Sequence, residues 1–247
     1  MSTWITGPRP LRWEAVTIRL VAVYTAVVVG LINLFILQNG APAARAIIIM
    51  ADGLILLWVV GFGVLTLRKR AVLTDWIRRW DIPWRRRFVW ACIALALLEE
   101  VITTSMTNTA PLFGLTPQEA HITGSTNYLH VVLFHSVVAF VPMFITWGYL
   151  LTRWAFRPLE VLVLFGISGT LAEAGLNPSS LYGGFWVFVY GWMIYLPACS
   201  IPPHRGAHRP PFWGYPAAVL LPMVAVAPIV PVVVWLRETL QIPLFVQ

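Results

Sequence analysis

The chain has 247 residues, of which 59% are hydrophobic and only 11% are charged. Soluble domains carry about 25% charged residues, so this composition excludes a soluble globular protein and indicates an integral membrane protein. The formal net charge of +7 would suit a nucleic acid partner. However, the basic residues gather in short loops between apolar stretches, so we expect no nucleic acid binding.

Seven apolar stretches follow one another along the chain. A membrane-spanning helix needs about 20 such residues, and each stretch is close to that length. The sequence therefore predicts an all-α fold, a polytopic transmembrane helical bundle in which residues 1–247 form a single integral membrane domain. We place the seven spans at 17–38, 46–67, 88–107, 129–152, 159–176, 184–202 and 214–236.

Basic residues alternate between the two sides of these spans. Fourteen of the 17 Lys and Arg residues fall in the N-terminal segment or in the loops after the second, fourth and sixth spans. Cytoplasmic loops are enriched in Lys and Arg, so we expect the N-terminus in the cytoplasm and the C-terminus outside, in a plasma or inner membrane. The only lysine, Lys69, lies in a loop, which excludes a retinal protein because no span carries a lysine for the Schiff base.

The 68–87 segment is the one long loop on the basic side. A short helix there would be capped by Thr74-Asp75 and would place three apolar side chains on one face: Trp76, Ile77 and Trp80. Tryptophans beside arginines are typical of a helix in the membrane interface. We predict that 68–87 anchors the topology and binds anionic lipids. A regulatory lipid sensor is the alternative.

The 108–128 loop on the opposite side has no Lys or Arg. It contains Thr116-Pro117-Gln118-Glu119, which is the pattern of a capping box with Pro at the first helical position. We interpret it as a surface turn. A short helix lying over the membrane as a lid is the alternative.

Ionisable residues inside the spans are the strongest functional signal. Such residues are costly in a membrane and usually mark a site. With the predicted orientation and a rise of about 1.5 Å per residue, they converge near the midplane or in the outer half of the bilayer. They are Asp52, Glu99, Glu100, His135 and Glu173, with His130 at the mouth of the fourth span.

Helical periodicity of about 100° per residue places several polar groups on shared faces. On the fifth span, Glu173 shares a face with Asn177, while Gly166 and Gly169 provide small-residue spacings that let helices approach closely. One sector of the third span holds four polar side chains: Glu99, Glu100, Thr103 and Thr107.

Adjacent carboxylates at low dielectric cannot both remain ionised at low cost, so we expect a shared proton or an acid/base pair. With an imidazole, they form a general base with a positioned water. The predicted catalytic residues are Glu99, Glu100, His135 and Glu173, supported by Asp52, Thr103, Thr107 and Asn177. A divalent metal ion such as zinc or iron could be held by Glu100, His135 and Glu173, and His130 could bind a cofactor.

Glu99-Glu100, followed by a histidine about thirty residues later, resembles the paired-glutamate motif of the CAAX-type intramembrane proteases. That family's motif continues to an arginine, where this chain has Val101-Ile102-Thr103-Thr104. Its His-x-x-x-Asn motif has Glu173-Ala174-Gly175-Leu176-Asn177 as a counterpart, and its site faces the cytoplasm. The resemblance therefore implies an analogous chemistry, in which glutamates and a histidine act on water.

Three functions fit these residues. The first is a membrane-embedded hydrolase or transferase that acts on a lipid-borne or peptide substrate. The second is a non-catalytic membrane subunit or a haem or quinone binder, for which His130 and His135 are available. The third is a proton- or ion-coupled transporter or channel, since buried carboxylates are typical of proton relays.

Overall fold

The structure is a computed structural model, and it describes residues 12–176, 181 and 184–245. In this part of the chain every regular element is a helix, which confirms the predicted all-α class. In chain order the elements are α1 (Arg12–Asn39), α2 (Pro42–Leu54), a π-helical segment (Ile55–Phe62), α3 (Gly63–Arg78), α4 (Trp84–Thr107), a 3₁₀ turn (Ala110–Phe113), α5 (Tyr128–Phe134), α6 (Val137–Arg153), α7 (Pro158–Leu176), α9 (Trp186–Cys199), α10 (Gly214–Val226) and α11 (Ile229–Thr239).

Several of these helices are long and apolar enough to cross a membrane. Five segments meet that condition alone: Ile18–Asn39, Pro42–Arg78, Trp84–Phe113, Pro158–Gly175 and Gly214–Thr239. The bent pair α5 and α6 would make a sixth, and α9 is a shorter apolar helix. Each of the seven predicted stretches thus coincides with helical structure, while the number of spans and their orientation remain predictions.

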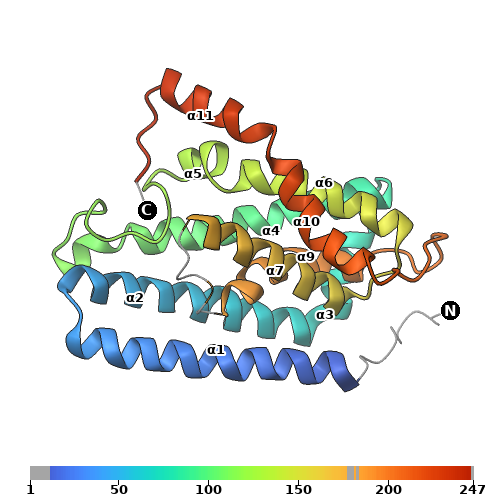
Figure 1. Ribbon diagram of the computed structural model, residues 1–247, viewed down its shortest axis with the longest axis horizontal. Coiled ribbons are helices and arrows are strands. Elements are labelled where there is room, and N and C mark those ends of the chain that lie inside the picture. Colours follow the sequence, from blue (N-terminus) through green and yellow to red (C-terminus); the bar gives the residue numbers. More distant parts are fainter. Residues whose placement is uncertain (1–11, 177–180, 182–183, 246–247) are drawn as a thin grey trace.

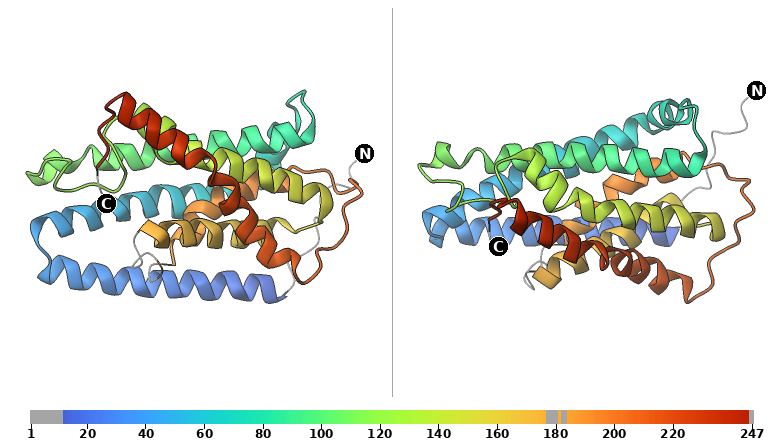
Figure 2. Two further views of the ribbon diagram at one scale, coloured as in Figure 1. Left: turned by 45° about the horizontal axis from the view of Figure 1, so that its top comes forward. Right: turned by 90° about the horizontal axis from the view of Figure 1, so that it is seen from above.

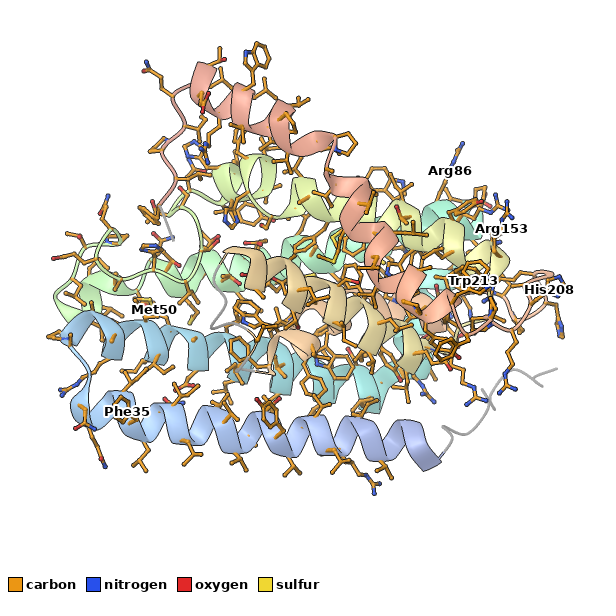
Figure 3. All side chains as sticks on the ribbon, in the orientation of Figure 1. Phe35, Met50, Arg86, Arg153, His208 and Trp213 are labelled. Atoms are coloured by element: carbon orange, nitrogen blue, oxygen red, sulfur yellow. The ribbon has the colours of Figure 1, made fainter. Side chains whose placement is uncertain are left out.

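The helices run side by side along the long axis of an elongated bundle (Figures 1 and 2). Arg86, Arg153 and His208 lie at one end of it, whereas Phe35 and Met50 lie toward the other (Figure 3). We call the first the basic end, which contains the connections 79–83, 154–157 and 200–213. The second is the loop end, which contains the turn 40–41 and the long loop 108–127. The loops predicted to share the cytoplasmic side are therefore grouped at the basic end.

Local sequence signals start several of the helices. Pro42 and Pro158 occupy the first positions of α2 and α7, where the missing N–H of proline costs no hydrogen bond. Glu160 accepts a hydrogen bond from the backbone N–H of Arg157 at 2.7 Å. The side chain of Asn127 caps α5 by accepting the N–H of Leu129 at 2.9 Å, as expected for an N-cap asparagine.

An aromatic core fills the bundle between α4, α6, α7 and α9. Its fully buried rings include Trp58, Phe88, Phe144 and Phe165. The Trp58 indole N–H donates to the carbonyl of Val189 at 2.9 Å, so its single polar atom is satisfied. This core ties the π-helical segment to α9.

Helices α7 and α9 approach each other through glycines. An added Cβ at Gly166 would overlap the backbone of Val187, and one at Gly169 would overlap the ring of Tyr190. The small-residue spacing predicted from the sequence therefore corresponds to a close helix–helix contact, and that contact sets the position of Tyr190.

Helix α1 lies at the periphery of the bundle (Figure 1). Many of its apolar side chains are exposed, among them Leu20, Leu31 and Phe35. A surface of this kind is suited to lipid and not to water. One polar contact links it to α2, because the Asn33 amide donates to Asp52 at 2.9 Å.

The predicted loop 68–87 is mostly helix, which corrects the expected boundaries at 67 and 88. Helix α3 continues to Arg78, and α4 begins at Trp84. No Gly or Pro occurs between Gly63 and Pro83, so no helix-breaking residue lies at the predicted boundary near residue 67.

The predicted separate interfacial helix is also wrong. Thr74 is buried inside α3 instead of capping a helix, and Ile77 is buried whereas Trp76 is exposed, so the three apolar side chains do not share one face. The Arg78 guanidinium donates to the carbonyl of Cys199 at 3.0 Å, which holds it against the protein. Anionic lipid binding by this segment remains a prediction, and its exposed basic residues are Arg68, Lys69, Arg70, Arg79, Arg85 and Arg86.

Candidate functional site

Helix α4 supplies two buried carboxyl groups to the loop-end half of the bundle. Glu99 and Glu100 are each only 4% exposed, although they are consecutive and point in different directions on the helix. The Thr103 hydroxyl, one turn later, donates to Glu99 Oε1 at 2.7 Å. Glu99 therefore has a hydrogen-bond partner on its own helix.

A break between α5 and α6 supplies an imidazole and a hydroxyl. Helix α5 ends at Phe134, α6 begins at Val137, and the two are bent by 45°. His135 and Ser136 form the break, with His135 at φ −130° and ψ −85°, outside the helical region. Gly124 of the long loop lies against this histidine, since a Cβ there would be 2.7 Å from the ring.

Helices α7 and α9 supply the third carboxyl group and two aromatic rings. Glu173 lies in the last turn of α7, and the Tyr190 hydroxyl donates a hydrogen bond to it. Trp186, one turn earlier on α9, stacks on Tyr190 with ring centroids 5.7 Å apart and an interplanar angle of 19°. The glycine contact of α7 with α9 fixes this group.

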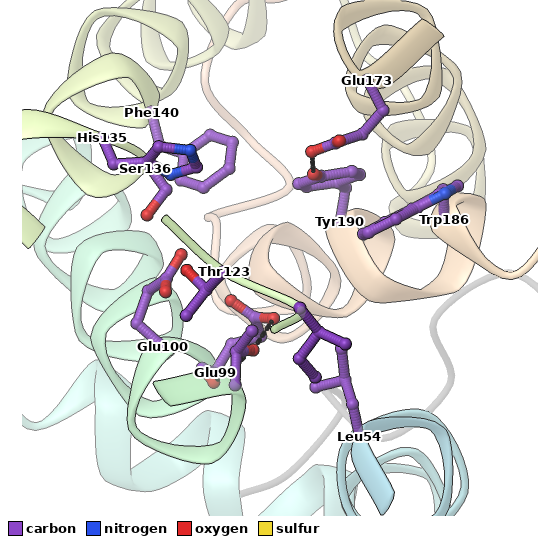
Figure 4. A pocket seen from close by; sticks show the side chains of 12 residues that line it. Leu54, Glu99, Glu100, Thr123, His135, Ser136, Phe140, Glu173, Trp186 and Tyr190 are labelled. Carbon is purple, nitrogen blue, oxygen red and sulfur yellow. Dashed lines mark hydrogen bonds between the residues drawn. The ribbon is translucent and has the colours of Figure 1, made fainter. Parts of the chain in front are cut away.

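These three sources meet around one cavity of about 50 Å³. Figure 4 shows Glu100, His135 and Ser136 on one side of it, with Glu173, Tyr190 and Trp186 on another. A water molecule needs a cavity volume of roughly 10–15 Å³, so this cavity has room for a few waters or a small polar group. Its lining comprises Leu54, Glu99, Glu100, Thr103, Ile122, Thr123, His135, Ser136, Phe140, Glu173, Trp186 and Tyr190.

Three buried polar atoms at this cavity have no hydrogen-bond partner of standard geometry. They are Glu100 Oε2, His135 Nδ1 and Ser136 Oγ. The Ser136 hydroxyl lies beside the Glu100 carboxyl (Figure 4), close enough to act on it as a hydrogen-bond donor although the geometry is not ideal. Buried polar atoms without a partner are unfavourable by about 1–3 kcal/mol each, so this group is built to meet a polar molecule in the cavity.

The charge of the cavity is one-sided. Among the described residues, three carboxyl groups line it and no Lys or Arg does. Arg237 of α11 acts on His135 electrostatically but is not part of the lining. Three carboxylates in one buried site cannot all remain ionised at low cost, so protons are held within the group.

The four predicted catalytic residues are brought together at the cavity. Glu99, Glu100, His135 and Glu173 all line the cavity, and so does the predicted supporting residue Thr103. Their catalytic roles remain predictions.

Three other predicted residues, Asp52, His130 and Thr107, are not part of the lining of the cavity. Asp52 faces α1 and pairs with Asn33, while the ring of His130 packs edge-on against Phe134 with centroids 6.5 Å apart. Thr107 accepts the backbone N–H of Ile122 at 3.1 Å and so acts indirectly, by fixing the loop that reaches the cavity. Asn177 lies outside the described residues.

Several residues that line the cavity were not predicted from the sequence. Ser136 follows directly after His135 in an apolar stretch, and that pairing was a usable signal. A buried tyrosine needs a hydroxyl partner, which could have linked Tyr190 to a carboxyl group. Thr123 gave no local signal, because only the folding of the long loop brings it to α4.

The predicted capping box in the long loop forms only a single turn. The Glu119 carboxylate accepts hydrogen bonds from the Thr116 N–H at 2.7 Å and from its hydroxyl at 2.8 Å, but no helix follows among residues 117–127. The loop then runs on to the cavity through Ile122 and Thr123. These two hydrogen bonds lower the pKa of the exposed Glu119 carboxyl.

A divalent metal ion was predicted on Glu100, His135 and Glu173. Across the described residues, no three His, Cys, Asp or Glu side chains are grouped closely enough to hold a metal ion. Carboxyl and imidazole groups can bind water without a metal ion. The metal ion remains a prediction, and the chemistry considered below uses water alone.

No family model matches the chain. No curated protein and no solved structure matches it significantly either.

Proposed function

We propose that the protein is a multi-pass membrane hydrolase that acts on a lipid-borne or peptide substrate through carboxylate-activated water. The observation that carries this proposal is the meeting of the Glu100 carboxyl, the Ser136 hydroxyl beside it and the His135 imidazole at a buried cavity large enough for water. Among the described residues, His135 Nδ1 has no hydrogen-bond partner there. An ionised carboxylate that lies within hydrogen-bond reach of a water is a suitable general base.

The chemical step uses the two glutamates of α4, Glu99 and Glu100, in different roles. Glu100, which lines the cavity, takes a proton from water while the water oxygen bonds to the electrophilic carbon of the substrate. The bond to the leaving group then breaks, and the leaving group receives a proton from one of the other acidic side chains of the cavity. Glu99, held by Thr103, and His135 are positioned to store and return that proton. A transferase would follow the same steps with another acceptor in place of water.

The membrane orientation forms part of the proposal. The basic end would face the cytoplasm by the positive-inside rule. The cavity would then lie in the outer half of the bilayer, where the long loop carrying Thr123 covers it. The membrane would be a plasma or inner membrane.

The packing between the cavity and the basic end favours an enzyme over a transporter. Along α4 the buried residues on that side are Phe88, Ala91, Cys92 and Ala96, and Phe144 closes against them. A proton or ion relay needs polar groups or water along its path. On the α4 side of the described core, the buried side chains between the cavity and the basic end supply no such groups.

The test is turnover by the purified protein in lipid nanodiscs against fluorogenic lipid esters, phospholipids and apolar peptides. Glu99→Gln and Glu100→Gln should each lower the rate by about 10²–10⁴-fold, which is the usual contribution of a general acid or base. Asp52→Asn is the matched control, because Asp52 is an acid in the same apolar zone that pairs with Asn33 outside the cavity.

Thermal unfolding of each variant separates a catalytic role from a structural one. The proposal expects Glu100→Gln to unfold at the wild-type temperature while its turnover is lost. It would be wrong if all substrates were turned over equally by wild type and both Gln variants. A drop in unfolding temperature that accounts for the lost activity would assign the cluster to helix packing. Proton flux in proteoliposomes that depends on Glu100 would instead identify a transporter.

A further inference from the structure

The cavity has a buried floor and a more open mouth. Glu99 and Glu100 on the floor are each 4% exposed, whereas Glu173 and Trp186 are both half-buried. A molecule that enters from the surrounding bilayer or the loop end therefore meets Glu173 and Trp186 before it reaches the α4 carboxyl groups.

The mouth combines a carboxylate with aromatic faces. Trp186 stacks on Tyr190, and Tyr190 also contacts Phe140 with ring centroids 5.5 Å apart. Its hydroxyl holds the Glu173 carboxyl at the edge of this aromatic group. Aromatic faces attract organic cations, and a carboxylate accepts the hydrogen bonds of an ammonium group.

The floor supplies a second acceptor of the same kind. Glu100 is more than nine-tenths buried and lines the cavity. Among the described residues, its Oε2 has no hydrogen bond of standard geometry, and the Ser136 hydroxyl lies beside the carboxyl. An ionised carboxylate can only accept hydrogen bonds, whereas a primary ammonium group carries three donors and no acceptor. The absence of Lys and Arg from the lining leaves these acceptors free for a ligand.

The size of the cavity limits the cation. About 50 Å³ is room for a few water-sized groups. A primary ammonium group with its first methylene fits this description, whereas a trimethylammonium group is bulkier and has no N–H donor for Glu173.

We infer that the substrate of this site carries a primary ammonium group, which Glu173 and the Trp186–Tyr190 pair bind at the mouth, while the negative charge of the α4 carboxyl groups below attracts it and leaves Glu100 available for water. This inference rests on the proposed function, because it names the chemical class of the substrate for the same cavity. The amine belongs either to a lipid headgroup or to a free or chain-terminal amine, which share this chemistry.

The test is the thermal unfolding of the full chain in phosphatidylcholine nanodiscs at pH 7 with n-butylammonium chloride. A saturable rise in unfolding temperature is expected, with an affinity about ten-fold or more above that of n-butanol, which has the same shape without the charge. Sodium chloride and tetramethylammonium chloride at equal concentration should give no saturable rise. Glu173→Gln and Trp186→Leu should each weaken butylammonium about ten-fold, while Asp52→Asn should not.

Equal stabilisation by butanol, sodium or tetramethylammonium would overturn the inference, and so would unchanged butylammonium affinity in both mouth variants. Nanodiscs containing phosphatidylethanolamine distinguish the two sources. Competition with butylammonium there assigns the amine to the headgroup, and unchanged affinity assigns it to a free or chain-terminal amine. Turnover that depends on Glu100 without any preference for the amine would leave the proposed function standing and remove this inference. Amine binding without any turnover would do the reverse.

Discussion

Both halves of α4 contribute buried residues to the bundle, and these residues differ in chemistry. Toward the basic end the buried residues are Phe88, Ala91, Cys92 and Ala96. Toward the loop end they are Glu99, Glu100, Thr103, Thr104 and Thr107. One continuous helix therefore passes from a dry aromatic core into a polar cavity within about one turn.

The difference shows that the two halves are maintained for different reasons. Apolar burial in the first half gives packing and dispersion energy. The second half contains Glu99, Glu100 and Thr103, which are buried and line the cavity. Burial of carboxyl groups is unfavourable for stability, so a ligand or a reaction in the cavity is the better explanation for their presence.

The largest effect is expected in the dry half. Phe144 is fully buried, and its ring lies 5.4 Å from that of Phe165. Phe144→Ala should lower the free energy of unfolding by about 3–5 kcal/mol, because it leaves a cavity in a packed core. Unfolding in mixed micelles with increasing sodium dodecyl sulfate measures this. Leu56→Ala is the control, since Leu56 is 64% exposed. Equal effects of the two changes would mean that this half is not a packed core.

A smaller effect is expected at the close contact between α7 and α9, which positions Tyr190 at the cavity. Gly169→Ala adds a Cβ that would overlap Tyr190, so the free energy of unfolding should fall by about 1–3 kcal/mol as Tyr190 is displaced from Glu173. Gly175→Ala on the same helix is the matched control, because its Cβ would meet nothing within 4 Å. That change should be neutral or slightly stabilising, by up to about 1 kcal/mol. If the two variants unfold alike, the glycine contact does not position Tyr190.

The sequence was sufficient to predict which acids would gather. Glu99, Glu100 and Glu173 are rare polar residues in apolar helices, and the alternation of basic loops indicated at which end of the bundle they would meet. Helical periodicity then gave the small-residue face of α7. Each of these signals depends on neighbouring residues or on counts along the chain, so it can be used without knowledge of the packing.

What the sequence could not give depends on contacts between distant segments. Thr123 reaches the cavity because Thr107 holds the backbone of Ile122, and nothing in the local pattern indicates that contact. Asp52 has the same apolar surroundings as the other acids, but its partner Asn33 turns it toward α1. The arginine-rich segment was predicted as a loop from its charge, whereas the helix continues because exposed arginines do not break helices.

The smallest effect concerns an acid outside the cavity, which sharpens the contrast with the buried ones. Glu119 is fully exposed and accepts two hydrogen bonds from Thr116. These bonds favour the ionised form, so the folded pKa lies below its ordinary value near 4.5. The contact is therefore fully present above pH 4.5 and is lost as the pH falls through the lower folded pKa.

Hydrogen exchange at the Thr116 amide should accelerate, relative to its intrinsic rate, on acidification in wild type. In Glu119→Gln it should be fast at all pH values, because the neutral amide is a weaker acceptor, while Glu238→Gln on α11 should behave as wild type. A pH-independent Thr116 amide in wild type would show that the turn is held by its backbone alone, in which case the loop that carries Thr123 reaches the cavity without help from this acid.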